Sequence, residues 1–167
     1  MMEPNKSKID NNSVCVLVSG GLDSSVLLAK LADEFQSIYP VYIKSNLLWE
    51  DCELYWLSKF LSAIKSRGIK SLKIINTTVN DIYQEHWSIT GINVPDKNTM
   101  DSAVNLPGRN IILLSKTAVF CGINKIPVIA IAGLKGNPFP DSSCEFFNLI
   151  QQGFSLGLDF RLSIITY

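Results

Sequence analysis

Residues 19–25 read Ser-Gly-Gly-Leu-Asp-Ser-Ser, and they lie between an apolar run and a helical pattern. The preceding run, residues 14–18, is short, β-branched and continuously apolar, as expected of a strand buried on both faces of a parallel sheet. After the turn, Leu28, Leu31 and Phe35 recur with the spacing of one helix face. Main-chain N–H groups and the positive end of the helix dipole would point into this turn, which suits it to bind a pyrophosphate.

The turn lacks the features of two common nucleotide-binding motifs. It has neither the Gly-x-x-x-x-Gly-Lys-Ser/Thr spacing nor the Gly-x-Gly-x-x-Gly pattern of dinucleotide sites. It resembles instead the PP-loop of the ATP pyrophosphatases. The resemblance implies that the loop binds the β- and γ-phosphates of ATP, which is split into AMP and pyrophosphate when a carboxylate is adenylated. An ordinary strand-to-helix turn is the alternative interpretation.

Composition limits the classes of function. With 167 residues, the chain is expected to form one domain with a substantial core. Its formal net charge of zero argues against an autonomous nucleic-acid-binding protein, and no apolar run is long enough for a membrane span. Charged residues make up 18% of the chain, below the roughly 25% of an average domain, so part of the surface is expected to be covered by another domain or subunit.

The N-terminal residues and the cysteines indicate the compartment. Residues 1–13 are polar and lack the apolar core of a signal peptide, so we expect a disordered tail followed by a domain over residues 14–167. The four cysteines are far apart and form no Cys-x-x-Cys pair, which favours free thiols in a reduced, cytoplasmic protein.

Apolar runs and helical periodicities alternate along the chain. This alternation predicts a parallel α/β sheet with right-handed crossovers, whose ligands bind at the carboxyl ends of the strands. Residues 77–108 are less regular, with one turn of helix expected near Asp81–Glu85. The predicted strands are residues 14–18, 38–43, 71–76, 128–132 and 161–167, and the later helices are residues 50–66 (stopped by Gly68), 110–122 and 143–157, the last capped by Ser142 or Ser143.

Further motifs narrow the resemblance to one family. Leu106-Pro107-Gly108-Arg109-Asn110 opens one predicted helix, and Pro140-Asp141-Ser142-Ser143-Cys144-Glu145-Phe146 opens the next. Together with Val94-Pro95-Asp96 upstream and Ser155-Leu156-Gly157 downstream, their order resembles that of the 7-cyano-7-deazaguanine synthases. The resemblance implies a three-layer α/β sandwich of the adenine nucleotide alpha hydrolase-like type, with a five-stranded, mainly parallel sheet in the order 3-2-1-4-5.

The same resemblance implies an activity. Members of this family convert 7-carboxy-7-deazaguanine to its nitrile with ATP, Mg²⁺ and ammonia, for the synthesis of queuosine and archaeosine. The partners would therefore be a small carboxylate and ammonia, with no direct nucleic-acid or membrane contact, in a homodimer. Two alternatives stay open: a PP-loop amidase or ligase that acts on a different carboxylate, and a catalytically impaired ATP-binding protein.

The resemblance, together with the rim that the loops of the sheet share, implies which residues form the site. Arg109, Asn110 and Asp23 are expected to be catalytic, and His86, Trp87, Asn137 and Asp141 to bind the substrate. Asp23 could cap its helix, accept loop N–H groups or help hold Mg²⁺. Arg109 could be solvated, and His86 and Trp87 could form a partly buried aromatic corner. The residues expected to bind ATP are Leu17, Val18, Ser19, Gly20, Gly21, Leu22, Asp23, Ser24, Ser25, Ile43 and Gly133.

Three features differ from the family's pattern. Residues 44–50 read Lys-Ser-Asn-Leu-Leu-Trp-Glu where the family has a Tyr-Gly-Gln-x-His stretch. Residues 134–139 lack the acidic run that the family has there, although Lys135 could meet a phosphate. Trp49 and Glu50 could face the nucleotide or substrate, or simply begin a helix. The family's four zinc-binding cysteines have no counterpart in this sequence, so we expect no zinc site on these residues.

Overall fold

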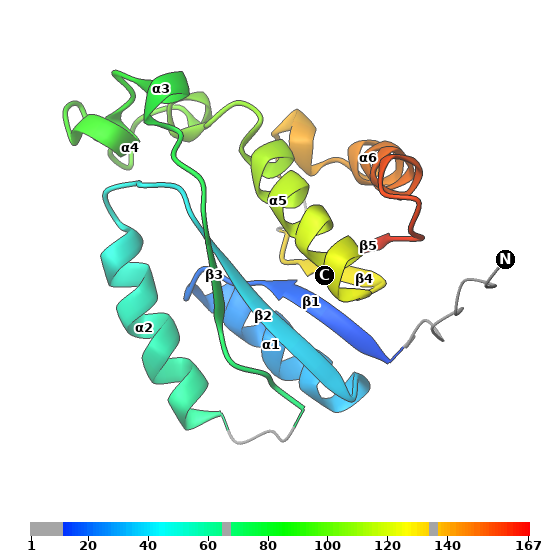
Figure 1. The fold of residues 1–167 in the computed structure, drawn as a ribbon. Coiled ribbons are helices and arrows are strands. Elements are labelled where there is room, and N and C mark those ends of the chain that lie inside the picture. The colour runs from blue at the N-terminus through cyan, green and yellow to red at the C-terminus, as the bar shows by residue number, and fades with distance from the viewer. Residues whose placement is uncertain (1–11, 65–67, 134–136) are drawn as a thin grey trace, which may run out of the picture.

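A computed structural model describes residues 12–64, 68–133 and 137–167 of the chain. Among these residues, five strands form a sheet in the order β3-β2-β1-β4-β5 (Figure 1). Each adjacent pair of strands is parallel. The predicted fold class and strand order are therefore confirmed. The strands are β1 (Ser13–Leu17), β2 (Ser37–Lys44), β3 (Lys73–Asn76), β4 (Val128–Ile131) and β5 (Ser163–Thr166).

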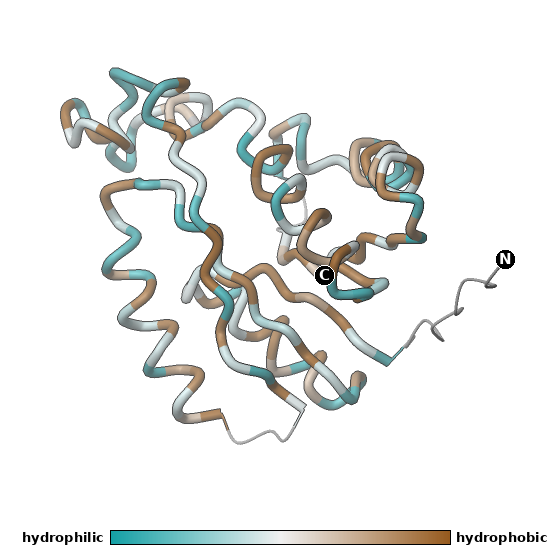
Figure 2. The backbone as a smooth tube through the Cα atoms, in the orientation of Figure 1, coloured by the Kyte–Doolittle hydropathy of each residue, from teal (hydrophilic) through white to brown (hydrophobic). Residues whose placement is uncertain are grey.

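Helices cover both faces of this sheet and give three layers. Their bounds are α1 (Leu22–Glu34), α2 (Glu50–Ala63), α5 (Arg109–Asn124) and α6 (Cys144–Gly157). Val14 and Val16 of β1 pack in the core with α1 and α2, whereas Cys15 and Leu17 pack in the core with α5 and α6. Figure 2 shows hydrophobic residues concentrated along the central strands. Because side chains alternate across a strand, an apolar run such as β1 fills both cores at once.

Several predicted boundaries differ from the structure; α5, for example, runs from Arg109 to Asn124 and not over residues 110–122. The α2 helix ends at Ala63 and not at Ser66, because Ile64 already has extended backbone. Gly68 does not stop the helix but lies beside β2, where its carbonyl accepts the N–H of Ile38 at 2.9 Å. At the other end of the chain, Ser143 caps α6 by accepting the N–H of Phe146 at 3.1 Å, which confirms one of the two predicted caps.

The segment between β3 and α5 crosses the carboxyl ends of the strands. It contains the short helices α3 (Asn80–Tyr83) and α4 (Trp87–Thr90) and the 3₁₀ turn η1 (Asp101–Val104), of which only the first was predicted. A small core of Leu47, Val79 and Leu106 holds this segment against the loop that follows β2. The segment is therefore packed onto the rim where ligands of such sheets bind.

The described part of the chain contains no helix long and apolar enough to cross a membrane. Lys135, which could meet a phosphate, lies outside the described residues.

Candidate active site

The loop after β1 is held by its own serine hydroxyls. Ser24 Oγ accepts the N–H of Ser19 at 3.1 Å and donates to the carbonyl of Gly21 at 3.2 Å. Ser25 Oγ donates to the same carbonyl at 2.8 Å, and Ser19 Oγ accepts the N–H of Gly21 at 3.3 Å. These bonds fix the curvature of the loop with side chains and leave main-chain N–H groups for other partners.

The first turn of α1 has three such N–H groups. No described residue accepts a hydrogen bond from the main-chain nitrogens of Leu22, Asp23 or Ser24. The residue that precedes the helix, Gly21, offers no side-chain cap, so the interpretation of Asp23 as the cap of α1 is wrong. Unpaired N–H groups at a helix start bind anions, and here the helix dipole adds to the attraction.

Gly20 brings this loop close to α2. Its φ of +77° lies in the left-handed region, and a Cβ at this position would overlap the carbonyl oxygen of Glu53 and lie 3.1 Å from the nitrogen of Leu57. Gly21 has an ordinary negative φ, and its Cβ would meet only the Ser19 hydroxyl, at 3.3 Å. The contact through Gly20 therefore places the first turns of α2 beside the loop.

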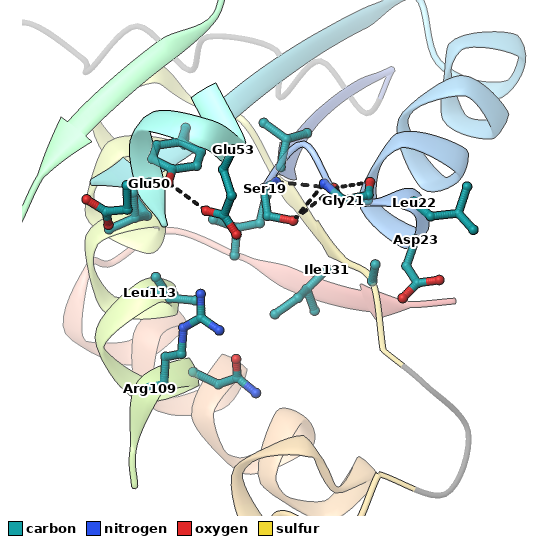
Figure 3. Close-up of a pocket in the computed structure, with 16 residues that line it drawn as sticks. Ser19, Gly21, Leu22, Asp23, Glu50, Glu53, Arg109, Leu113 and Ile131 are labelled. Carbon is teal, nitrogen blue, oxygen red and sulfur yellow. Dashed lines mark hydrogen bonds between the residues drawn. The ribbon is translucent and has the colours of Figure 1, made fainter. Parts of the chain in front are cut away.

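A cavity of about 230 Å³ opens between the loop and α5 (Figure 3). It brings together most of the residues expected to bind ATP, together with Arg109 and Asn110. Gly20 and Ser25 support the loop from outside the lining, and Gly133 lines a neighbouring cavity with Asp23 and Asn137. The predicted residues in the lining are Leu17, Val18, Ser19, Gly21, Leu22, Asp23, Ser24, Ile43, Arg109 and Asn110, and the others are Tyr42, Glu50, Glu53, Leu113, Ile131 and Ala132.

Arg109 is the first residue of α5, and Figure 3 shows its side chain across the cavity from Glu53. Within the described residues, the ion pair present joins Lys44 to Asp51, and Arg109 forms none. A cation at a helix start opposes the helix dipole, although the Asp141 carboxylate, which accepts the N–H of Asn110 at 2.9 Å, offsets part of this effect. A guanidinium can grip phosphate or carboxylate oxygens with two parallel hydrogen bonds.

Two glutamates of α2, Glu50 and Glu53, line the first cavity across from Arg109, and they form different hydrogen bonds. Glu50 is buried, and its carboxylate accepts the N–H groups of Ser45 and, at 2.8 Å, Asn46. Glu53 Oε2 accepts a hydrogen bond from the Tyr42 hydroxyl at 2.7 Å. Burial raises the pKa of Glu53, against the lowering effects of the Tyr42 hydrogen bond and the Arg109 charge. No sequence motif singled out Glu53, although its position one turn after Glu50 on a helix at the rim was a usable signal.

A second cavity, of about 280 Å³, adjoins the first and shares Arg109 and Asn110 with it. Two tryptophans line it: the ring centroids of Trp49 and Trp87 are 5.2 Å apart with an interplanar angle of 34°. The Trp87 indole N–H donates to the carbonyl of Ala103 at 2.9 Å, which fixes the ring. Such a site offers flat apolar surfaces to a planar ligand next to a cationic group.

Three of the four residues expected to bind substrate line this second cavity: Trp87, Asn137 and Asp141. The fourth, His86, does not; it begins α4, where its Nδ1 accepts the N–H of Ser88 at 3.2 Å. Trp49, which the sequence left between a helix start and a ligand contact, precedes the first residue of α2 and lines the second cavity.

A family model described as queuosine biosynthesis protein QueC matches residues 13–166. The chain belongs to the QueC family. Among curated relatives of this QueC chain, 7-cyano-7-deazaguanine synthase 1 of Desulfitobacterium hafniense (strain Y51) is 28% identical over 142 residues, which are 84% of this chain and 63% of that protein. The 7-cyano-7-deazaguanine synthase of Sulfurihydrogenibium sp. (strain YO3AOP1) is 29% identical over 143 residues, 83% of this chain and 62% of that protein.

The chain thus spans about three fifths of the length of these relatives. Its fold is also similar to a crystal structure described as a predicted subunit of tRNA methyltransferase from Methanocaldococcus jannaschii, with a TM-score of 0.54 and 16% identity. That similarity covers 92% of this chain and 66% of the other, and it supports the fold alone.

The residues of the first cavity include a group that could bind Mg²⁺. Asp23 lines the first cavity beside the unpaired N–H groups of α1. One carboxylate with phosphate oxygens and water is a common donor set for Mg²⁺, so the loop and Asp23 fit Mg-ATP. Among the described residues no group of three or more His, Cys, Asp or Glu side chains is placed to hold a metal ion.

Proposed function

We propose that this QueC-family chain activates a carboxylate with ATP, forming AMP and pyrophosphate, and that ammonia then displaces AMP to give an amide. The reaction is most like the conversion of 7-carboxy-7-deazaguanine to 7-cyano-7-deazaguanine, in which the amide is afterwards dehydrated to the nitrile. The observation that carries the proposal is the position of Arg109, a cation without an ion-pair partner among the described residues, where the two cavities meet.

The first cavity would hold ATP. The N–H groups at the start of α1 would bind the β- and γ-phosphates, with Asp23 as a ligand of Mg²⁺. Mg²⁺, when bound, would neutralise phosphate charge. The α-phosphate would then lie toward Arg109, which can stabilise the negative charge that develops there during transfer to the carboxylate. The protein acts in this scheme by positioning and by charge, without a covalent intermediate of its own.

The second cavity would hold the carboxylate substrate. Trp49 and Trp87 would stack on its planar ring, and Arg109 would orient the carboxylate toward the α-phosphate. Asn110 is tied to Asp141, so it would keep the helix start and Arg109 in place.

A second candidate is the same reaction on a different planar acid. It is favoured by Trp49, which lies in the stretch of residues 44–50 that differs from the family's Tyr-Gly-Gln-x-His pattern and which lines the second cavity. A changed wall of a substrate pocket alters which rings it accepts.

The test is an assay with 7-carboxy-7-deazaguanine, ammonium and Mg-ATP, in which AMP, pyrophosphate and the organic products are measured by mass spectrometry. Amide and nitrile formation is expected. AMP release only with another planar acid would support the second candidate. ATP binding without any release of pyrophosphate would overturn both candidates and indicate a catalytically impaired ATP-binding protein. A reaction without carboxylate controls for simple hydrolysis of ATP.

A further inference from the structure

We infer that Glu53 binds the ammonium ion and accepts a proton from it, so that neutral ammonia forms inside the first cavity next to the activated carboxylate. The inference rests on the proposed function, and it assigns a role to a group that the adenylation step leaves unused.

The position of Glu53 is set by contacts on two sides. The Tyr42 hydroxyl, on a side chain that is 2% exposed, donates to Oε2 at 2.7 Å. The main chain of Glu53 lies against Gly20, which places the residue beside the loop after β1. The other carboxylate oxygen, Oε1, has no hydrogen-bond partner among the described residues, and Figure 3 shows the carboxylate between the loop and Arg109.

The chemistry needs such a group. Ammonia, like an amine side chain, is protonated at neutral pH, and the ammonium ion has no lone pair with which to attack. A carboxylate attracts the cation and offers a lone pair to one of its protons. A carboxylate whose pKa is raised by burial is also a stronger base than one in water.

The other ionisable groups around Glu53 are less suited to this role. Glu50 already accepts two main-chain N–H groups. Burial raises the pKa of Tyr42, which keeps this hydroxyl neutral and a donor. Arg109 is a permanent cation, and Asp23 lies beside the unpaired N–H groups that suit phosphate. Glu53 is therefore the carboxylate in the cavity wall whose second oxygen has no hydrogen-bond partner among the described residues. It lies between the loop after β1 and Arg109.

Proton transfer from ammonium to Glu53 precedes the formation of the amide bond. One N–H bond of ammonium breaks, and its proton goes to Oε1 of Glu53. The nitrogen lone pair that is released forms a C–N bond with the acyl carbon, the bond from that carbon to the AMP oxygen breaks, and AMP leaves with the electron pair. The added nitrogen loses a second proton to solvent, and Glu53 later returns its own proton to solvent.

The test compares Glu53→Gln with the wild-type chain, using ammonium and hydroxylamine as alternative nucleophiles. Glutamine keeps an acceptor for Tyr42 but is not basic. Hydroxylamine is largely neutral at neutral pH, so it needs no base before attack. With ammonium, amide formation by the variant is expected to fall roughly 100-fold or more. Hydroxamate formation is expected to stay within about twofold of wild type, since only the base is lost. The amide defect should shrink as rising pH supplies free ammonia.

Glu145→Gln, an exposed glutamate in the first turn of α6, is the matched control and should change neither rate. If Glu53→Gln lowers amide and hydroxamate formation equally, or lowers neither, the inference is wrong while the proposed function stands. If the wild-type chain forms neither product nor AMP, the proposed function itself fails, and the inference with it. Should Glu53→Gln fold poorly, Tyr42→Phe serves instead: losing its hydrogen bond should raise the pKa of Glu53 further and shift the pH profile of amide formation upward.

Discussion

Asp141 caps the helix that begins at Arg109: its Oδ2 accepts the main-chain N–H of Asn110 at 2.9 Å. The Asn110 side chain in turn donates to the carbonyl of Asp141 at 3.0 Å and to the Ser142 hydroxyl at 3.1 Å. The two motifs that open α5 and α6 are thus joined directly, although they lie 31 residues apart. The pairing fixes the start of α5, and with it the side chain that lies between the two cavities.

Asp141→Ala is expected to lower the free energy of unfolding by about 1 kcal/mol, the usual cost of losing a helix cap. It should also lower turnover, because Arg109 is no longer held in place. Urea unfolding and AMP release measure the two effects. Asp33→Ala, on the exposed face of α1, is the matched control and should be close to wild type in both.

Arg109→Ala is expected to reduce kcat roughly 100-fold, with a much smaller change in the affinity for ATP, if the guanidinium stabilises charge that develops in the transition state. Arg109→Lys should recover part of the loss, because lysine keeps the charge but not the paired donors. Equal losses in turnover and in ATP affinity would instead describe a clamp on ground-state phosphate. The exposed Arg161 supplies the control substitution, Arg161→Ala.

Substitution of Gly20 is expected to affect folding, whereas substitution of Gly21 is expected to affect ATP binding. Gly20→Ala places a Cβ on left-handed backbone, at a cost of about 1–2 kcal/mol, and against the carbonyl of Glu53. We therefore expect a clear loss of stability. Gly21→Ala should fold nearly as the wild type, whereas Gly21→Val should abolish ATP binding by blocking the approach of phosphate to the loop. Calorimetric titration with Mg-ATP and urea unfolding test the pair. Comparable stability of the two alanine variants would contradict the prediction.

Trp49→Ala and Trp87→Ala should each raise the KM for the carboxylate roughly tenfold, as expected when an aromatic ring that stacks on a planar ligand is lost. The KM for ATP should change little, since neither ring lines the first cavity. Trp56→Ala removes a tryptophan that is 58% exposed on α2 and is the control. Steady-state kinetics with each substrate varied in turn measures the difference; a larger effect on ATP than on the carboxylate would place the nucleotide in the second cavity.

The stability of the chain should depend on pH through Glu53. Burial raises the pKa of this carboxyl in the folded state, with Tyr42 and Arg109 opposing the rise. A carboxyl with a raised pKa favours the folded state when protonated, and this contribution disappears as the pH rises through the folded pKa. From about pH 4, near the ordinary glutamate pKa, toward neutrality, wild type should therefore lose stability relative to Glu53→Gln. Unfolding free energies over this range measure the difference, which should grow with pH.

Much of the fold follows from local patterns. The β-branched runs at β1 and β4 and the glycine-rich turn between β1 and α1 each specify their element through neighbouring residues alone. Parallel strands also bring their carboxyl ends to one edge of the sheet. The loop after β1 and Arg109 could therefore be expected at the same rim from the sequence. The ends of helices and strands are harder to predict from the sequence. The α2 helix ends at Ala63 because the backbone becomes extended at Ile64, and no Gly or Pro marks this position.

The sequence by itself determined the glycine- and serine-rich loop after β1, the layered sheet and the cationic helix start, because each depends on residues a few positions apart. Only the tertiary structure decided which side chains meet across the rim: Glu53 with Tyr42, Trp49 with Trp87, and Asn110 with Asp141. The members of each pair come from different elements. Their contact depends on how α2, α5 and the segment before α5 pack on the sheet, which local periodicity does not encode.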